Sequence, residues 1–242
     1  MFANAFFLGG TMFKRITGYF TKGEIALWSI SVFITIISFT AFDRENYFIL
    51  TASLIGVTSL IFNAKGNPFG QFLMVIFSIL YGIISYSFAY YGEMITYLGM
   101  TGPMAAFALI SWLKNPYKGK KSEVEVNHIN NKEAVFMMLL TVFVTVLFYF
   151  ILRHFNTANL FLSTASVTTS FIAVYLTFRR SAYFAVAYTA NDIILIILWI
   201  MATFTDISYI SVIICFVIFL ANDIYGFISW KRMSKRQKSD IA

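Results

Sequence analysis

Charged residues are scarce in this chain, and cysteine is almost absent. Only 12% of the 242 residues are Asp, Glu, Lys or Arg, whereas 59% are hydrophobic. Soluble domains carry about 25% charged residues, so the composition excludes an ordinary soluble domain and predicts a membrane protein. The single Cys215 cannot form an intrachain disulfide, and cysteine use therefore says nothing about the cellular compartment.

The motifs of common membrane-embedded chemistries are also missing. No Lys lies inside a predicted span, which excludes a retinal Schiff base, and the sequence contains no HExxH, GxSxG or GxGD motif. The two histidines, His128 and His154, fall near opposite membrane surfaces, so no metal site is predicted. We therefore expect a protein that is not an enzyme and that requires no cofactor.

Hydrophobic segments are the main feature of the sequence, and each is long enough for a transmembrane helix of about 17–25 residues. Eight spans are predicted: 25–42, 47–64, 68–90, 94–113, 134–152, 158–178, 182–204 and 207–230. Phenylalanines in residues 1–24 indicate a helix that lies on the membrane surface. The charged loop 114–133 and the basic tail 231–242 are expected to be solvated. The fold class is therefore an all-α polytopic membrane protein.

Basic residues lie almost entirely on one side of the predicted membrane. If the eight spans alternate in direction, 16 of the 18 Lys and Arg residues share a side, and only Arg44 and Arg153 lie on the other. The positive-inside rule makes the basic side cytoplasmic, together with both termini. The net charge of +7 is thus attributed to topology, and no nucleic-acid partner is expected.

Two short patterns recur along the chain at nearly the same spacing. Asn46 and Thr51-Ala52-Ser53 recur as Asn159 and Thr164-Ala165-Ser166, and Ile110-Ser111-Trp112 recurs as Ile228-Ser229-Trp230. They predict two three-helix units, 47–113 and 158–230, which are joined by linker helix 134–152 and preceded by an extra helix, 25–42. Because the linker returns the chain to the same face, we expect the units to be parallel repeats.

Acidic residues inside the predicted spans are the strongest candidates for a binding site. Asp192 and Asp223 are the only charges within any span, and each belongs to a copy of the tetrapeptide Ala-Asn-Asp-Ile. An ionisable residue at membrane depth costs about 2.5–3.5 kcal/mol on insertion scales, so it usually faces a cavity or a partner. We expect Asn191, Asp192, Asn222 and Asp223 to bind substrate. The alternative is that they only hydrogen-bond between helices and hold the bundle together.

Other polar residues share the faces of neighbouring spans and complete the candidate site. Gln71, Ser78 and Tyr81 lie on one face of helix 68–90, and Tyr188 and Tyr225 lie within one turn of the two Asn-Asp steps. This first unit is expected to contribute no acidic counterpart.

A hinge is predicted in helix 94–113. Pro103 cannot donate a hydrogen bond to the carbonyl of Gly99, and it should therefore kink the helix. We interpret Gly99 and Pro103 as gating residues, with a static kink as the alternative.

Several of these patterns together resemble the PnuC family of bacterial vitamin transporters. The resemblance rests on Gly66-Asn67, Tyr81-Gly82, Tyr91-Gly92-Glu93-Met94, Pro103-Met104, Trp112 with Asn115, and Asn222-x-x-Tyr225-Gly226 with Trp230. It implies a fold like that of the SWEET proteins and import of nicotinamide riboside, an NAD precursor, by facilitated diffusion. A cytoplasmic salvage kinase would then trap the substrate by phosphorylation.

The same resemblance implies a location in the bacterial inner membrane, a homo-oligomer such as a trimer, and substrate contacts by Gln71, Asn191, Asn222 and Tyr225. The chain departs from the family at one position, where Ala187, followed by Tyr188, replaces a Trp. This departure leaves thiamine and riboflavin open as substrates. The cationic ring of nicotinamide riboside or thiamine suits aromatic faces with a nearby carboxylate.

Two further functions are compatible with the sequence. One is a proton-coupled carrier that uses Asp192 or Asp223 as the coupling group. The other is a membrane-embedded sensor or scaffold without transport, in which the polar residues only pack helices.

The predicted orientation is tested by cysteine labelling. Ser122→Cys and Ser239→Cys, each in a Cys215→Ser background, should react with a membrane-impermeant maleimide only from the cytoplasmic side. Labelling of either position in intact cells would refute the orientation and, with it, the argument for parallel repeats.

Overall fold

The computed structural model describes residues 18–87, 91–204 and 207–240, and the surface helix predicted in residues 1–24 falls almost entirely outside them. Helices dominate the described chain: α2 (Lys22–Phe42), α3 (Tyr47–Ala64), α4 (Pro68–Ser87), α5 (Tyr91–Thr96), the π-helix η1 (Tyr97–Thr101), α6 (Gly102–Lys114), α7 (Asn131–His154), α8 (Leu160–Phe178), α9 (Phe184–Thr203), the short 3₁₀ helix η2 (Ile207–Tyr209) and α10 (Ile210–Ser239).

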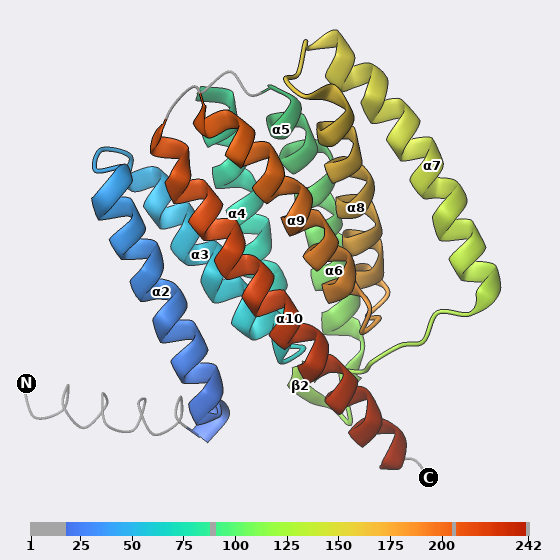
Figure 1. The fold of residues 1–242 in the computed structure, drawn as a ribbon. Coiled ribbons are helices and arrows are strands. Elements are labelled where there is room, and N and C mark those ends of the chain that lie inside the picture. Colours follow the sequence, from blue (N-terminus) through green and yellow to red (C-terminus); the bar gives the residue numbers. More distant parts are fainter. Residues whose placement is uncertain (1–17, 88–90, 205–206, 241–242) are drawn as a thin grey trace, which may run out of the picture.

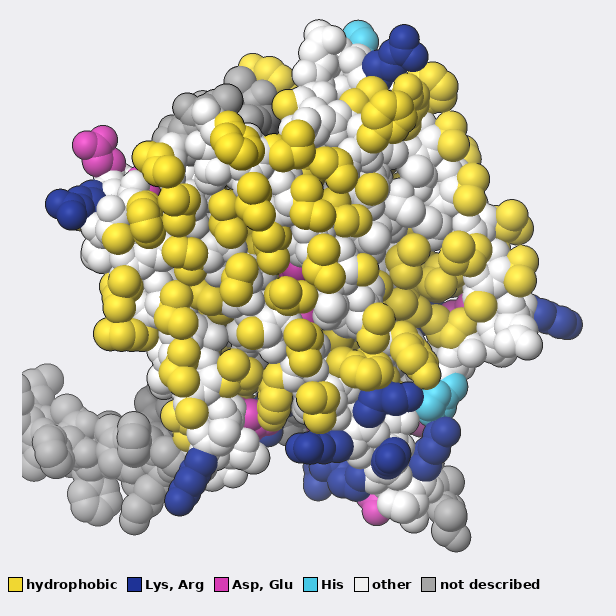
Figure 2. All heavy atoms as spheres, in the orientation of Figure 1, with side chains coloured by type: hydrophobic (Ala, Val, Ile, Leu, Met, Phe, Trp, Pro, Cys, Tyr) yellow, Lys and Arg dark blue, Asp and Glu magenta, His cyan; other side chains and the backbone are white. Residues whose placement is uncertain are grey.

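Within the described residues, eight helical segments are long and apolar enough to cross a membrane. The predicted all-α polytopic fold with eight spans is therefore confirmed, with boundaries that differ by a few residues. One of these spans, Tyr91–Lys114, combines α5, η1 and α6. The spans run side by side, with α2 and α7 at opposite flanks (Figure 1). Hydrophobic side chains cover the visible face, and most visible Lys and Arg side chains gather at its lower end (Figure 2).

Two groups of three spans form the centre of the bundle. In the first group α4 packs against α3 and α6, and in the second α9 packs against α8 and α10. The groups meet through two reciprocal contacts, α3 with α10 and α8 with α6. The linker α7 packs chiefly against α8, and the extra helix α2 packs against α3 and α10. In this arrangement the first helix of each group contacts the third helix of the other group.

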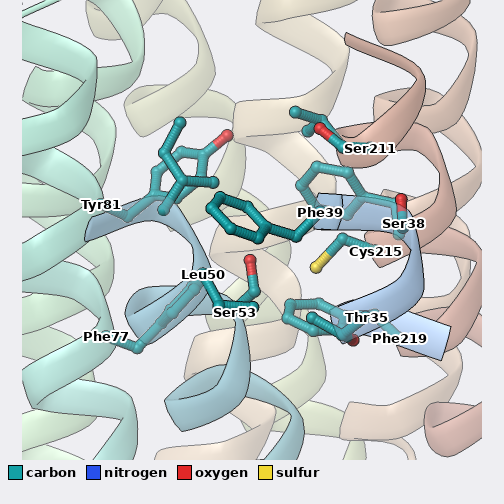
Figure 3. A pocket seen from close by; sticks show the side chains of 13 residues that line it. Thr35, Ser38, Phe39, Leu50, Ser53, Phe77, Tyr81, Ser211, Cys215 and Phe219 are labelled. Carbon is teal, nitrogen blue, oxygen red and sulfur yellow. The ribbon is translucent and has the colours of Figure 1, made fainter. Parts of the chain in front are cut away.

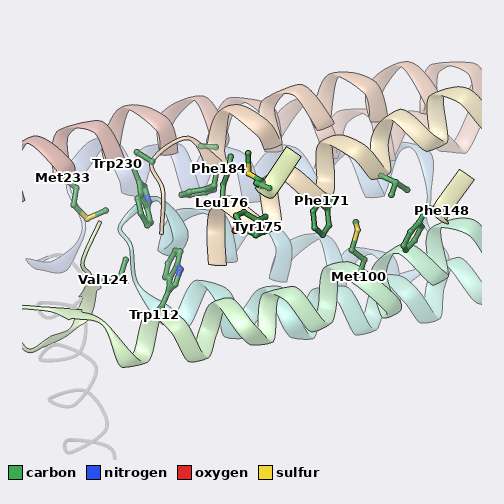
Figure 4. Close-up of a cluster of buried hydrophobic side chains, with 14 of the residues drawn as sticks. Met100, Trp112, Val124, Phe148, Phe171, Tyr175, Leu176, Phe184, Trp230 and Met233 are labelled. Carbon is green, nitrogen blue, oxygen red and sulfur yellow. The ribbon is translucent and has the colours of Figure 1, made fainter. Parts of the chain in front are cut away.

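The two Ile-Ser-Trp copies make equivalent bonds at the Lys- and Arg-rich end. The indole N–H of Trp112 in α6 donates to the carbonyl of Thr177 in α8 (2.9 Å). The indole N–H of Trp230 in α10 donates to the carbonyl of Asn63 in α3 (2.7 Å). The two rings are fully buried and lie 5.3 Å apart between centroids (Figure 4). Each indole adds a second donor to a carbonyl in the last turn of a helix, because the backbone N–H three residues later, of Arg180 or Gly66, already donates to it.

Glycine allows the closest approaches between helices. A Cβ atom on Gly70 of α4 would lie 2.7 Å from the backbone nitrogen of Asn63 in α3. A Cβ atom on Gly56 of α3 would lie 2.8 Å from the ring of Phe219 in α10. Small residues at such crossings let helices pack by van der Waals contact in lipid, where the hydrophobic effect does not drive association.

The loop and the tail at the basic end differ from the prediction of solvated segments. The loop forms a short antiparallel pair, β1 (Pro116–Tyr117) with β2 (Lys120–Val124), and α10 continues to Ser239 without a break at Trp230. Gln237 is 4% exposed because its amide nitrogen donates to the carboxylate of Glu123 and the carbonyl of Val124. The expectation was wrong because polar side chains of this helical extension find partners in the loop.

The equivalence of the two tryptophans is testable. Trp112→Phe and Trp230→Phe should each lower the free energy of unfolding by about 1 kcal/mol, because each removes one of the hydrogen bonds that a buried carbonyl accepts. Thermal unfolding of the purified protein in detergent measures this loss. Trp28→Phe is the comparison, since its indole N–H donates to the Thr58 hydroxyl (3.2 Å) at a position that is 37% exposed, and its loss should cost less than that of a buried bond. Equal losses in all three variants would contradict the assigned role of these bonds.

Candidate transport site

The first three-helix group contributes an acidic residue to its spans, contrary to the prediction. Glu93 belongs to α5, inside the span Tyr91–Lys114, and its carboxyl group interacts with the hydroxyl of Tyr81 in α4. It also lines a cleft of about 280 Å³ at the end opposite the basic residues, together with Trp199 and Asn159. The first unit therefore does contribute an acid. The sequence contained a signal for it, because residues four apart lie on the same face of a helix and Glu93 would therefore share a face with Tyr97.

Asp192 and Asp223 are brought together by the packing of α9 against α10. Their carboxyl groups are close enough to interact electrostatically, and the two residues are only 3% and 5% exposed. Oδ2 of Asp192 has no hydrogen-bond partner among the described residues. The same part of the chain contains no group of three or more His, Cys, Asp or Glu residues that could hold a metal ion. The pair is therefore a buried acidic centre that is suited to a polar or cationic ligand.

Tyrosines from both units surround these acids. The rings of Tyr81 and Tyr97 lie 4.4 Å apart between centroids, and Phe77 packs 5.5 Å from Tyr81. Tyr97 interacts electrostatically with Glu93 and Asp192, and Tyr188 does so with both aspartates. We call these residues the acid–tyrosine cluster: Tyr81, Glu93, Tyr97, Tyr188, Asp192 and Asp223. The sequence-based prediction included four of the six as site residues, and it omitted Glu93 and Tyr97 from that set.

Asn191 lies beside the cluster but points to α8. Its side-chain oxygen accepts hydrogen bonds from the hydroxyls of Thr169 (2.9 Å) and Ser170 (3.1 Å). These two hydroxyl residues were not among the predicted site residues, although they belong to the polar run Thr168-Thr169-Ser170. The amide and the two hydroxyls form a polar patch next to the acids.

The structure separates three predicted substrate contacts from the cluster. The amide nitrogen of Asn222 donates to Ser31 Oγ in α2 (3.1 Å) and to the carbonyl of Ile218 (2.8 Å). The hydroxyl of Tyr225 donates to Glu24 in α2 (2.9 Å), and Gln71 donates to Asn63 Oδ1 in α3 (2.9 Å). In this conformation Asn222, Tyr225 and Gln71 connect helices.

Ser78 is also engaged within the bundle. Its hydroxyl donates to the carbonyl of Met74 one turn earlier, at 2.9 Å. A Cβ atom on Gly102 would lie 3.4 Å from Ser78 Cβ, so this position is a close α4–α6 crossing. Ser78 therefore contributes to helix packing here.

The cavity beside Tyr81 is too small for a nucleoside. Tyr81 lines a cavity of about 40 Å³ between α2, α3, α4 and α10, together with Ser53, Cys215 and Phe219 (Figure 3). Ligand pockets for drug-sized molecules usually have volumes of about 300–1,000 Å³. The cluster lies between this cavity and the cleft that Glu93 lines, because the Tyr81 hydroxyl interacts with Glu93. The described conformation is thus closed around the acids, and binding of a larger ligand requires helix movement.

The predicted hinge region takes the form of a π-helical turn. The N–H of Gly102 donates to the carbonyl of Tyr97, five residues earlier. Pro103 follows as the second residue of α6. Proline has no N–H to offer the carbonyl of Gly99, and the wider turn accommodates this loss. The turn begins at Tyr97, so any change in its geometry would move a ring of the acid–tyrosine cluster.

A buried ion pair ties α2 to the bundle at the basic end. Glu24 is 3% exposed and accepts bonds from Lys65 Nζ (3.0 Å), the backbone N–H of Thr21 (2.7 Å) and the hydroxyl of Tyr225. Lys65 also lies over the ring of Tyr19, 4.9 Å from its centroid. Glu24 was predicted to lie in the surface segment 1–24, but α2 begins at Lys22 and buries this carboxylate. The pair closes the basic end of the interface among α2, α3 and α10.

A bundle of apolar helices around buried acids and tyrosines, approached by a cleft from one end, defines a multi-pass membrane protein with a central polar site. Residues 46–232 match the family model of the nicotinamide mononucleotide transporter, and the chain belongs to this family. It is also 25% identical over 199 residues to the nicotinamide riboside transporter PnuC of Neisseria mucosa, a match that spans 81% of this chain and 76% of the relative.

The fold is similar to that of a solved protein as well. The crystal structure of the vitamin B3 transporter PnuC superposes with a TM-score of 0.78 at 24% identity, over 90% of this chain and 94% of that one. The family resemblance in the sequence motifs is confirmed, as is the expectation of a transporter rather than an enzyme.

The role of Asn222 in helix packing is testable with a double-mutant cycle. Asn222→Ala and Ser31→Ala should show a coupling energy of about 0.6–1.7 kcal/mol in the free energy of unfolding, the range for hydrogen bonds between membrane helices. Thr35→Ala is the control partner, since its hydroxyl bonds only to its own helix, and it should combine additively with Asn222→Ala. If Asn222 and Ser31 are additive and only Asn222→Ala impairs ligand binding, Asn222 contacts substrate instead.

Proposed function

We propose that this protein imports nicotinamide riboside across the bacterial inner membrane by facilitated diffusion. A cytoplasmic kinase would phosphorylate the riboside and prevent its return. The observation that carries the proposal is the acid–tyrosine cluster, which joins the two units of a transporter-family fold. The similarity to a nicotinamide riboside transporter over 81% of the chain supports the choice of substrate.

The chemistry of the cluster suits the parts of the riboside. The ligand has a cationic pyridinium ring, a carboxamide and a ribose. The faces of Tyr81, Tyr97 and Tyr188 are able to hold the cationic ring, and Asp192 and Asp223 balance its charge. Asn191, with its two hydroxyl neighbours, offers donors and acceptors for the carboxamide or the ribose.

The names of the family and of the relative point to different ligands, the mononucleotide and the riboside. The two molecules differ by a phosphate group, which carries close to two negative charges at neutral pH. That phosphate would meet the carboxyl groups of Glu93, Asp192 and Asp223 in a site of low solvent exposure. Repulsion between like charges is strong where water is excluded, so we favour the riboside.

Transport requires the closed structure to open alternately at its two ends. We propose that the π-helical turn with Gly99 and Pro103 is the hinge that moves Tyr97 and opens the cleft lined by Glu93. At the other end, the Glu24–Lys65 pair would have to loosen before substrate leaves. Both termini on the cytoplasmic side and a homo-oligomer such as a trimer remain predictions.

A second candidate function is proton-coupled transport, which the arrangement of the acidic residues favours. Glu93 lines the cleft at the end opposite the basic residues and interacts with Tyr81, whose ring packs at a tilt against that of Tyr97 near Asp192. The titratable groups thus extend from the cleft to the aspartate pair. Uptake into proteoliposomes separates the two mechanisms, because facilitated diffusion is insensitive to a collapsed proton gradient and proton-coupled uptake is not.

The substrate is tested by isothermal titration calorimetry of the purified protein with nicotinamide riboside, its mononucleotide, nicotinamide, thiamine and riboflavin. Riboside should bind and the mononucleotide should not. Asn191→Ala should weaken riboside binding about ten- to a hundred-fold, because it leaves polar groups of the buried site unpaired. Asn46→Ala is the control, since this exposed residue makes no side-chain cap bond.

Three results of these measurements would contradict the proposed substrate or the proposed role of Asn191. Tight mononucleotide binding would overturn the electrostatic argument. No binding of any of the five ligands, by a protein that folds normally, would favour the sensor or scaffold function. Normal riboside binding by Asn191→Ala with a lower melting temperature would restrict Asn191 to helix packing.

A further inference from the structure

A cleft of about 470 Å³ opens at the basic end of the molecule, away from the acid–tyrosine cluster. It lies between the start of α7 and the extension of α10, with the α8–α9 turn as its floor. Its lining combines two kinds of surface. One is polar and basic, with His128, Lys231, Ser234 and Lys238, and the other is apolar, with Ile129, Ala134, Met137, Leu176 and Ala182. We call it the α7–α10 cleft.

The basic residues of this cleft are not neutralised. No acidic residue lines it, and neither Lys231 nor Lys238 belongs to an ion pair within the described residues. Nearby cations differ in this respect, because Arg179 pairs with Glu133 and Arg236 pairs with Glu123. The cleft therefore carries uncompensated positive charge.

Neighbouring groups hold Lys231 in place. Its ammonium donates to the Tyr183 hydroxyl (3.2 Å) and lies 4.7 Å from the centroid of that ring and 5.8 Å from that of Phe227. Lys238 follows seven residues later, on the same face of α10. Between them, Ser234 Oγ lies 3.5 Å from Nε2 of His128. The two ammonium groups, a hydroxyl and an imidazole thus converge on one side of the cleft.

The other side of the cleft continues into the lipid-facing surface. The linker α7 packs chiefly against α8 and stands at the flank of the bundle (Figure 1). Met137 and Leu176 are buried at the cleft, whereas Leu139 and Phe136 of α7 are 66% and 57% exposed. Basic side chains border the hydrophobic surface at this end of the molecule (Figure 2). The occupant must therefore be anionic at one end and apolar at the other.

We propose that the α7–α10 cleft binds an anionic phospholipid, with its phosphate between Lys231 and Lys238 and an acyl chain along Met137 and Leu176. Basic pockets between transmembrane helices on the cytoplasmic side recognise such headgroups. The imidazole of His128 and the hydroxyl of Ser234 supply further donors to phosphate oxygens. A bound lipid would then link α7 to α10, two helices that are otherwise connected mainly through α8 and α9.

Binding of the lipid also predicts a change at His128. Burial and the nearby Lys238 and Lys231 lower the pKa of this histidine. A phosphate anion between the two lysines would offset their repulsion of the imidazolium, so the pKa should rise on binding. The other histidine is removed by His154→Gln, which leaves a single imidazole signal in the NMR spectrum.

The experiment uses the full-length, delipidated protein in neutral detergent. Dioleoyl phosphatidylglycerol and dioleoyl phosphatidylcholine, which differ only in headgroup, are titrated while the retained lipid is counted by native mass spectrometry. Phosphatidylglycerol should bind preferentially, and Lys231→Gln/Lys238→Gln should weaken it about 25-fold, roughly fivefold for each lysine. Glycerol 3-phosphate and inorganic phosphate are parallel arms, which should bind much more weakly because they lack the acyl chain.

The control variant is Lys120→Gln/Lys121→Gln, which removes the same charge from exposed positions of β2 at the same end. It should bind phosphatidylglycerol as the wild type does. Equal weakening by both double variants would show only general attraction to the basic surface and would overturn the proposal, as would equal binding of the two lipids. Binding of free phosphate as tightly as lipid would reassign the cleft to a soluble anion. An unchanged melting temperature of each variant without lipid confirms that the fold is intact.

Discussion

Hydrogen bonding between helices is the constraint on which this structure depends, because lipid offers no partner to a buried polar group. A buried hydroxyl can bond to a carbonyl of its own helix, as Ser78 does, but larger polar side chains such as those of Asn and Trp find complementary groups on a neighbouring helix. Trp112 and Trp230 illustrate this at the basic end, where each indole satisfies a carbonyl at the end of another helix. Asn191 and Asn222 illustrate it deeper in the bundle, with hydroxyl partners on α8 and α2. The positions of the helices follow largely from these pairings and from the close contacts at glycine.

The acid–tyrosine cluster is where this rule is least satisfied. One oxygen of Asp192 lacks a hydrogen-bond partner among the described residues, and the adjacent Asp223 brings a second carboxyl group instead of a compensating cation. A buried polar group without a partner is costly, so such an arrangement is expected at a functional position rather than at a packing contact. The cluster also lies where the two units meet. A transporter that opens alternately at its ends has to place its substrate there, because only that interface is reachable from both sides.

The extra helix α2 changes how the predicted site should be understood. It lies outside the range of the family model, which begins at residue 46, yet it supplies Ser31 to Asn222 and Glu24 to Tyr225. Two residues that resemble family substrate contacts are thus engaged by a helix that the family model does not include. If the basic end opens during transport, α2 has to move with α10 or release it. The conformation described here is closed at that end, which is consistent with these bonds.

The sequence by itself determined the membrane class, the eight spans and the family, because hydrophobic length and the order of short motifs are local properties. It also singled out Asp192 and Asp223, since a charge in an apolar run is conspicuous without any structure. Only the tertiary structure decided which polar groups meet. The spacing of Asn191 and Asp192 shows that they point in different directions, but not that one reaches α8 and the other Asp223. Glu93 was placed outside its span because helix ends are poorly defined by composition, and the folded extension of α10 depends on partners more than 100 residues away in the chain.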